Sequence, residues 1–432
     1  MGTNATDSNT KAELLANWPV LVVAFLLVFF SFGVPNFSLP FMYKPAMDEF
    51  GWTNTQVNLL STAKFLIGAV AALGMGILID KIGGKIAVLI GALAGGCAMA
   101  LFLIATTLPI YYLAGALLGV SASSIVSAMK VVVSRLFELN PGLALGIVLG
   151  ATSMGQTLMP FVWTPLLDAG VNWRVIAGFL SLGSLLISAP LWLFFMSRAG
   201  ATQDVINSST HRAPGAPTMW DRAKEISKEK GFWLIMLSIF LVSGVDQAMT
   251  QNTVTYLRND KGFNLGDIVW YSAFTGILAV ISKPVAGWVY DHYSITGIRF
   301  FYFLLAISVL LALPVSGGLT LFMFVTVLGI AHGGLIVEAP VLTKHYLGPR
   351  NLGMTIGIVS VAVNLGFAAG PPVLGMFVDH YGSYANGFMA FAVISLVGFS
   401  LMLPIKPRFW TKPGKRKQEP EAAATKLRPA SI

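Results

Sequence analysis

Four charged side chains lie inside long apolar stretches of this sequence, where an ion is costly to place. Lys283 stands in LAVISKPVAGWVY, with no other charged residue in the fifteen positions before it or the seven after it. Lys64, Asp246 and Glu338 also lie in apolar stretches. A charge at the centre of a bilayer costs about 2.5–3.5 kcal/mol on insertion scales, and such residues usually mark an ion or substrate pathway. The chemistry on offer is anion binding by the lysines and proton exchange by the carboxylates.

The two lysines are candidates for binding an anion. Lys283 is two helical turns, about 12 Å, from Asp291 at the end of its segment, which is far for a lysine that only extends to the membrane surface. Lys64 is about 14 Å deep in its segment. We expect it to contact the anion as well, or else to form a pairing that only holds the structure together. Lys130 lies late in its segment and reaches the surface easily.

The two carboxylates are candidates for proton coupling. Asp246 lies in SGVDQAMTQNT, where part of the polar set shares one helix stripe. The alternative is a static ion pair with Lys64 or Lys283. Glu338 follows His332 by six residues, and both are candidates for handling protons. The alternative for Glu338 is a structural pair with Lys130 or another cation.

Neutral polar side chains in the apolar stretches complete the candidate binding set. Asn36, Gln156 and Asn364 offer hydrogen bonds to a substrate, but equally to a neighbouring helix, where each is worth about 0.6 kcal/mol. Tyr271 is a candidate for lining a cavity. Contact with lipid or with the protein core is the default for any one aromatic ring.

The elements that must position these residues are membrane-spanning helices. The 432 residues are 55% hydrophobic and 11% charged, against about 25% charged in a soluble protein. A helix needs about 20 apolar residues to cross a bilayer. The sequence has twelve such segments: 18–43, 55–79, 86–106, 108–132, 142–167, 173–196, 231–256, 265–289, 298–315, 319–343, 352–377 and 384–405. The fold class is therefore an all-α membrane protein with twelve transmembrane helices.

The polar intervals divide the chain and orient it. The predicted parts are an N-terminus (1–17), a six-helix bundle (18–196), a linker with a short amphipathic helix (197–230), a second six-helix bundle (231–405) and a disordered tail (406–432). Placing the N-terminus inside puts 21 of the 28 Lys and Arg residues in the cytoplasm and four outside. Both termini are therefore predicted to be cytoplasmic, in the plasma (inner) membrane.

A repeated motif indicates that the two bundles are related. Gly76-x-x-x-Asp80-Lys81-x-Gly-Gly-Lys85 follows the second segment, and Gly287-x-x-x-Asp291-His follows the eighth. Glycine and aspartate suit any helix end, but the matched position, six helices later, favours duplication. Two related halves predict a site between them near the midplane. Glycines four residues apart, such as Gly146 with Gly150 and Gly366 with Gly370, predict close helix packing.

These features resemble the major facilitator superfamily over essentially the whole chain. GILIDKIGGK is similar to that family's loop motif between helices two and three. The resemblance implies two pseudo-symmetric six-helix bundles and a cytoplasmic gate. Its gating residues would be Asp80, Lys81, Lys85, Asp291 and Arg135.

Finer features resemble the monocarboxylate-porter and oxalate/formate-antiporter branch of that family. They are FMYKPAMDEFGW, SRLFELNPGLALGI, GVNWR and the run HYLGPRNLGMTIG…GPPVLGMFVDHYGSY. In that branch a cation followed by proline, eight residues before the loop aspartate, binds the substrate carboxylate. Lys283-Pro284 has this spacing to Asp291. Oxalate-type members carry a further lysine where this chain has Val359, so the resemblance implies a substrate with one carboxylate.

The sequence thus predicts a secondary active transporter of a small organic anion, a proton-coupled monocarboxylate symporter working by alternating access. An anion exchanger, an exporter of amphipathic compounds and a non-transporting membrane sensor remain alternatives. The expected partners are a small carboxylate, protons and the lipid bilayer, for a monomeric protein that binds no nucleic acid. One cysteine, and no P-loop, HExxH or CxxC pattern, predict no cofactor, no metal and no enzyme activity.

Overall fold

The computed structural model describes residues 17–82, 84–136, 141–198, 219–348 and 352–410, and every regular element in these ranges is helical. The first half of the chain begins with a helical span over Asn17–Phe50. That span contains a π-helical turn, η1 (Phe29–Gly33), and ends as α2 (Val34–Phe50). It is followed by α3 (Asn54–Ile82), α4 (Gly84–Leu101), η2 (Phe102–Ile104), α5 (Leu108–Leu136), α6 (Pro141–Asp168) and α7 (Trp173–Arg198).

The second half repeats this succession of long helices. It begins with the short α9 (Met219–Ile226), the amphipathic helix predicted for the linker. The long helices are α10 (Lys230–Asn259), α11 (Leu265–Tyr293), α12 (Ile295–Ala312), α13 (Gly318–Leu335), α15 (Leu352–Tyr381) and α16 (Tyr384–Met402). Two short elements, α14 (Glu338–Leu342) and η4 (Thr343–Leu347), continue α13.

The helices confirm the predicted all-α membrane fold. In the part of the chain that the structure describes, nine helices are long and apolar enough to cross a membrane. Beyond these nine, α3, α6 and α7 have 29, 28 and 26 residues, which also exceed the length of about 20 that a crossing requires. Most of the predicted termini lies outside the described residues, as does 199–218 of the linker.

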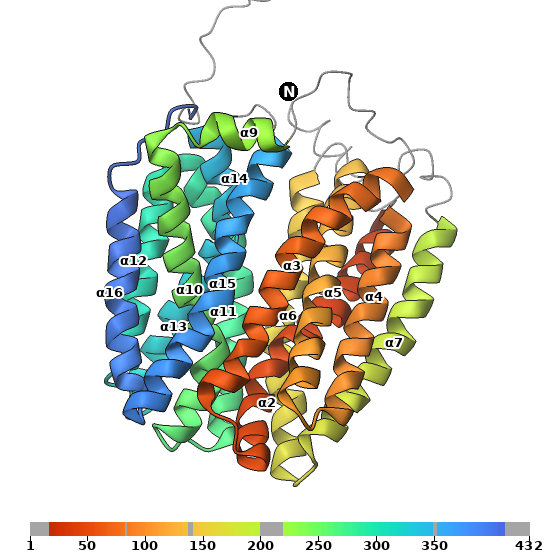
Figure 1. Cartoon of the computed structure of the whole chain (residues 1–432), viewed down its shortest axis with the longest axis vertical. Coiled ribbons are helices and arrows are strands. Elements are labelled where there is room, and N and C mark those ends of the chain that lie inside the picture. The colour runs from red at the N-terminus through yellow and green to blue at the C-terminus, as the bar shows by residue number, and fades with distance from the viewer. Residues whose placement is uncertain (1–16, 83, 137–140, 199–218, 349–351, 411–432) are drawn as a thin grey trace, which may run out of the picture.

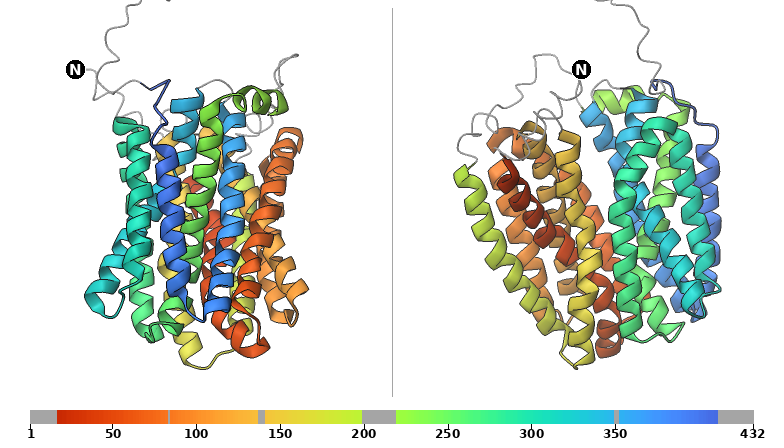
Figure 2. Two further views of the ribbon diagram at one scale, coloured as in Figure 1. Left: turned by 60° about the vertical axis from the view of Figure 1, so that its left-hand side comes forward. Right: turned by 180° about the vertical axis from the view of Figure 1, so that it is seen from behind.

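The helices form two groups that lie side by side. Figures 1 and 2 show α2–α7 on one side and α10–α16 on the other. The groups diverge toward the end of the molecule that carries α9, called the α9 end below. They converge at the opposite end, where α2 meets α3, called the far end below.

Two helices differ from their predicted form. The first was predicted to end at residue 43 but continues to Phe50, where Gly51 takes a left-handed conformation (φ 66°) and its N–H bonds to Met47 O. The tenth was predicted as one helix over 319–343 but breaks after Leu335. Pro340 has no N–H to donate to the carbonyl of Ile336, four residues earlier, so the break has a local cause.

Glycines let the first and fifth long helices of each half approach closely. A Cβ atom on Gly155 of α6 would lie 2.2 Å from Gly33 O, and one on Gly370 of α15 would lie 1.9 Å from Gly244 O of α10. No other residue fits at such distances. The prediction for Gly370 is therefore confirmed, but that for Gly150 is wrong, because a Cβ there would meet nothing within 4 Å.

The two groups are joined at the far end by Asp379, near the end of α15. Its carboxylate accepts hydrogen bonds from the backbone N–H groups of Asn54 (2.8 Å) and Thr55 (2.8 Å), at the start of α3. The side chains of both residues also donate to it, at 3.1 and 2.5 Å. A carboxylate at a helix N-terminus satisfies free N–H groups and opposes the positive end of the helix dipole. Asp379 of one bundle therefore caps a helix of the other.

Replacing Asp379 with alanine should open the far end. Losing hydrogen bonds to a charged group removes roughly 1.5–3 kcal/mol, enough to shift a closed-to-open ratio about tenfold or more. Spin labels at Ala169→Cys and Gly266→Cys, in a Cys97→Ala background, should report a new, longer distance by electron double resonance. Asp48→Asn is the matched control, since Asp48 bonds only to Lys44 of its own helix among the ion pairs described. An unchanged distance distribution in Asp379→Ala would refute the closure.

Candidate functional site

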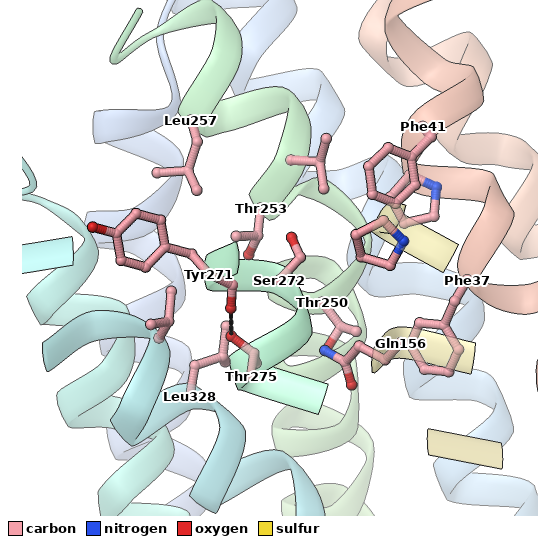
Figure 3. A pocket seen from close by; sticks show the side chains of 14 residues that line it. Phe37, Phe41, Gln156, Thr250, Thr253, Leu257, Tyr271, Ser272, Thr275 and Leu328 are labelled. Atoms are coloured by element: carbon pink, nitrogen blue, oxygen red, sulfur yellow. Dashed lines mark hydrogen bonds between the residues drawn. The ribbon is translucent and has the colours of Figure 1, made fainter. Parts of the chain in front are cut away.

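A small pocket lies between the two groups of helices (Figure 3). Phe37 and Phe41 of α2 and Gln156 of α6 line it from one group. Hydroxyls from the other group face them, and these belong to Thr250 and Thr253 of α10 and to Ser272 and Thr275 of α11. The cavity volume is about 30 Å³, room for about two water molecules. In this conformation the pocket is therefore too small for an organic anion.

The pocket contains two of the residues predicted to bind substrate, Gln156 and Tyr271. Tyr271 contributes its ring and a backbone carbonyl that already accepts a hydrogen bond from Thr275 Oγ1 at 2.8 Å. Gln156 Oε1 is buried without a hydrogen-bond partner among the described residues. An unpaired buried acceptor costs about 1–3 kcal/mol, so this atom favours a ligand or water that donates to it. The pocket thus has aromatic rings on one side, hydroxyl groups on the other, and one hydrogen-bond acceptor without a partner, Gln156 Oε1.

Lys283 bridges the two groups of helices on the α9 side of the pocket. Its Nζ donates to Thr152 Oγ1 at 3.1 Å and to Ser153 Oγ at 2.5 Å, both on α6. The salt bridges found among the described residues do not include it. Thr152 is one helical turn from Gln156, so α6 leads from the pocket to the lysine along one face. The ammonium group is held by neutral hydroxyls that a stronger acceptor would displace.

Lys64 and Asn36 lie together, outside the lining of this pocket. Lys64 is 2% exposed and donates to Asn36 Oδ1. Its Nζ lies 5.5 Å from the ring centre of Phe32 and 4.8 Å from that of Phe65, within range of a cation–π interaction. The ring of Phe65 packs 4.9 Å from that of Phe367 on α15. The second lysine therefore lies among an amide and aromatic rings at the contact between α3 and α15.

Asp246 pairs with His332 rather than with a lysine. Its Oδ1 and Oδ2 lie 2.9 and 3.0 Å from His332 Nδ1 on α13, and both side chains are buried. The sequence offered Lys64 or Lys283 as its partner, but those two amines bond elsewhere. Thr250 Oγ1 donates to the backbone carbonyl of Asp246 and lies 3.5 Å from His332 Nδ1. Thr250 also lines the pocket, so the pair begins one side chain away from it.

Glu338 is buried directly after the break between α13 and α14. It is 2% exposed, and its Oε2 has no hydrogen-bond partner among the described residues. Tyr290, Tyr302 and Asp246 are close enough to interact with it electrostatically. Lys130, the cation proposed for it, has a side chain outside the described part of the chain.

The remaining predicted residues are not brought to the pocket by the described contacts. Asn364 donates from Nδ2 to Ser360 O of its own helix, α15, at 2.8 Å. The predicted gating residues lie on α3, α4, α5 and α11 near their ends, but their side chains are outside the described residues: Asp80, Lys81, Lys85, Asp291 and Arg135. Val359 is fully buried in α15.

Several residues in these contacts carried no signal in the sequence. Thr152 and Ser153 hold Lys283, yet hydroxyls are common in membrane helices and often bond their own backbone. His332 was predicted to handle protons, but its contact with Asp246 was not predicted. The sequence offered one clue to this contact: Asp246 is an acid and His332 a base, and both lie in apolar segments.

Comparison with known proteins identifies the arrangement. The family model described as Major Facilitator Superfamily matches residues 21–326 and 298–431. Monocarboxylate transporter 12 of Xenopus laevis is 24% identical over 345 residues, covering 74% of this chain and 72% of that protein. The oxalate:formate antiporter of Oxalobacter formigenes is 23% identical over 417 residues, covering 94% and 95%. The crystal structure of the nucleoside transporter NupG superposes with a TM-score of 0.73 at 16% identity, covering 90% of this chain and all of that one.

The Lys64–Asn36 contact can be tested by a double-mutant cycle. Lys64→Met and Asn36→Leu should each lower the unfolding temperature in detergent, because each leaves one buried polar partner without its hydrogen bond. The double variant should be more stable than the sum of the two changes predicts, with a coupling of about 1–3 kcal/mol. Scanning fluorimetry of the four proteins measures this. Strict additivity would mean that the two side chains do not depend on one another.

Proposed function

Because this chain belongs to the Major Facilitator Superfamily, we propose that it is a secondary active transporter of a small organic anion, a monocarboxylate carried together with a proton. The observation that carries the proposal is Lys283, a cation at the interface of the two bundles whose recorded partners are two hydroxyl groups. A carboxylate offers that ammonium a charge-assisted hydrogen bond, which is roughly twice as strong as a neutral one.

The route of the substrate passes between the bundles. The bundles 18–196 and 231–405 rock about the pocket and expose it alternately at the α9 end and at the far end. The distribution of Lys and Arg supports a cytoplasmic α9 end, since α9 belongs to the linker predicted to be cytoplasmic. The observed closure by Asp379 is then the outward-side closure. In the conformation described the outward side is closed, and Lys283 still joins the bundles between the pocket and the α9 end.

The substrate site extends from Lys283 to the pocket. Lys283 holds the carboxylate, and Gln156 Oε1 accepts a hydrogen bond from a hydroxyl or another protonated group of the substrate. The rings of Phe37 and Tyr271 contact the apolar part of the anion. Asn36, Lys64 and Asn364 act as further contacts when the bundles rearrange. Val359, where oxalate-type relatives carry a lysine, supports one carboxylate rather than two.

Asp246 and Glu338 supply the proton coupling. Both are buried, and neither has a lysine or arginine partner among the described ion pairs. A proton taken up with a monovalent anion leaves the net charge of the closed site unchanged. Charge balance of this kind lowers the cost of moving an anion through a low-dielectric core.

Anion exchange is the second candidate. It is favoured by the match to an oxalate:formate antiporter over 94% of this chain. An exchanger needs the same cationic anchor but no net proton movement.

Removing the ammonium group should weaken binding of the anion. In proteoliposomes, Lys283→Gln should take up [¹⁴C]lactate and [¹⁴C]benzoate about 10- to 100-fold more slowly, because a charged hydrogen bond contributes about 1.5–3 kcal/mol. Lys283→Arg should retain part of the uptake, since it keeps the charge. Lys44→Gln is the control, because Lys44 is partly exposed and forms its salt bridge with Asp48 of the same helix, α2. Unchanged affinity in Lys283→Gln would rule out the anchor.

Symport and exchange are separated by measuring protons. In the symporter, lactate entering pyranine-loaded vesicles should acidify the lumen, and an uncoupler should abolish accumulation. In an exchanger, uptake should require preloaded anion, and the pyranine signal should stay flat. Uptake of neither lactate nor benzoate above that of protein-free vesicles would contradict the monocarboxylate proposal.

A further inference from the structure

The contact between Asp246 and His332 joins two helices of the second bundle. Asp246 is on α10 and His332 on α13, 86 residues apart in the chain, and both carboxylate oxygens lie within 3.0 Å of the same imidazole nitrogen. The side chain of Asp246 is 1% exposed and that of His332 is 6% exposed. Histidine is the one side chain that ordinarily changes charge between about pH 5 and 8. The imidazole is thus the more accessible member of a buried pair.

Thr250 connects this pair to the pocket. Its Oγ1 donates to Asp246 O at 2.8 Å and stands 3.5 Å from His332 Nδ1, while its side chain lines the cavity. In Figure 3 the labelled Thr250 lies near Gln156, whose Oε1 is unpaired. The pair and the pocket are therefore separated by a single side chain, that of Thr250.

Few charged groups of the described residues bear on the pair. Glu338, at the start of α14, interacts electrostatically with Asp246 and is itself surrounded by Tyr290 and Tyr302. Lys283 on α11 is bonded across to α6, and Lys64 on α3 is bonded to Asn36. Protonation of the pair is therefore controlled mainly by its own two members and by Glu338.

We propose that the transported proton is held by Asp246 and His332 as a unit, in which Nδ1 keeps the proton that faces the carboxylate and Nε2 takes up and releases the transported proton. This inference rests on the proposed proton-coupled function. With one proton shared between the two side chains the pair has a net charge of −1. A second proton, taken from water in the pocket, gives an imidazolium–carboxylate pair of net charge zero, and the same proton returns to water on release.

The packing of α13 links the pair to the anion site. Gly333, next to His332, packs so closely on α11 that a Cβ there would lie 2.5 Å from Ala279 O. Ser282 Oγ, beside Lys283, donates to Ile330 O of α13 at 2.6 Å. The helix that carries His332 is therefore in direct contact with the helix that carries Lys283.

The test compares His332→Gln with wild type in the full-length protein. The glutamine amide can donate to Asp246 but cannot take up a proton. Uptake of [¹⁴C]lactate driven by an inward proton gradient should fall at least tenfold, while counterflow of lactate, which needs no net proton movement, should stay within threefold. His380→Gln, an exposed histidine at the far end, should behave as wild type in both assays. Gradient-driven accumulation by His332→Gln equal to wild type would overturn the inference.

A second readout does not depend on transport. The chain has five histidines, so ¹⁵N-histidine labelling gives few side-chain signals, and that of His332 is the one lost in His332→Gln. The signal should respond to a change of pH, and that response should differ in Asp246→Asn. A signal that keeps one form throughout would overturn the inference. If the wild-type protein transports neither lactate nor benzoate, the proposed function fails. The pH response of the His332 signal still shows whether Asp246 and His332 exchange a proton as a unit.

Discussion

The structure depends on how closely helix backbones approach one another at glycine. Lipid gives no hydrophobic driving force between helices, so their association rests on close van der Waals contact and interhelical hydrogen bonds. In each half the second and fourth long helices meet this way. A Cβ on Gly119 of α5 would lie 2.0 Å from Lys64 O of α3, and one on Gly333 of α13 would lie 2.5 Å from Ala279 O of α11. Together with the contacts at Gly155 and Gly370, these positions give the two halves the same internal framework.

The buried charged side chains are placed differently in the two halves, although the helices pack alike. This difference puts Lys283 at the interface between the bundles. In the first half the lysine is at the glycine contact itself, so the backbone of Lys64 faces α5 while its side chain bonds to Asn36 of α2. In the second half the lysine comes one turn later, and Lys283 reaches α6 across the interface. His332, beside the matching glycine, pairs with Asp246 instead. A shared backbone plan thus carries two different arrangements of charge.

Sequence reasoning identified the helices and the unusual residues but not their partners. A hydrophobic run of sufficient length predicts a membrane helix by itself, which is why the all-helical fold could be predicted. The short helix α9 could be predicted from its amphipathic pattern. The face of one helix says nothing about which other helix it meets. Asp246 was therefore matched to the lysines rather than to His332, and Gly150 was taken for the packing position that belongs to Gly155. The role of Asp379 also depends on a contact, with a helix start 325 residues away.

The position of Lys283 gives a physical reason why an empty carrier would be hard to open. Its ammonium bonds to hydroxyls of the opposite bundle, and Thr152 already donates its own proton to Leu149 O, so that hydroxyl is oriented to accept from the lysine. Separating the bundles on the α9 side of the pocket breaks both contacts. Until water enters the gap, the cation has no partner in a medium of low dielectric, at a cost of several kcal/mol. A bound carboxylate would move with Lys283 and satisfy it without α6. If Lys283 is the anchor, the substrate removes the penalty for rearrangement, and obligatory coupling follows from one lysine and two hydroxyl groups.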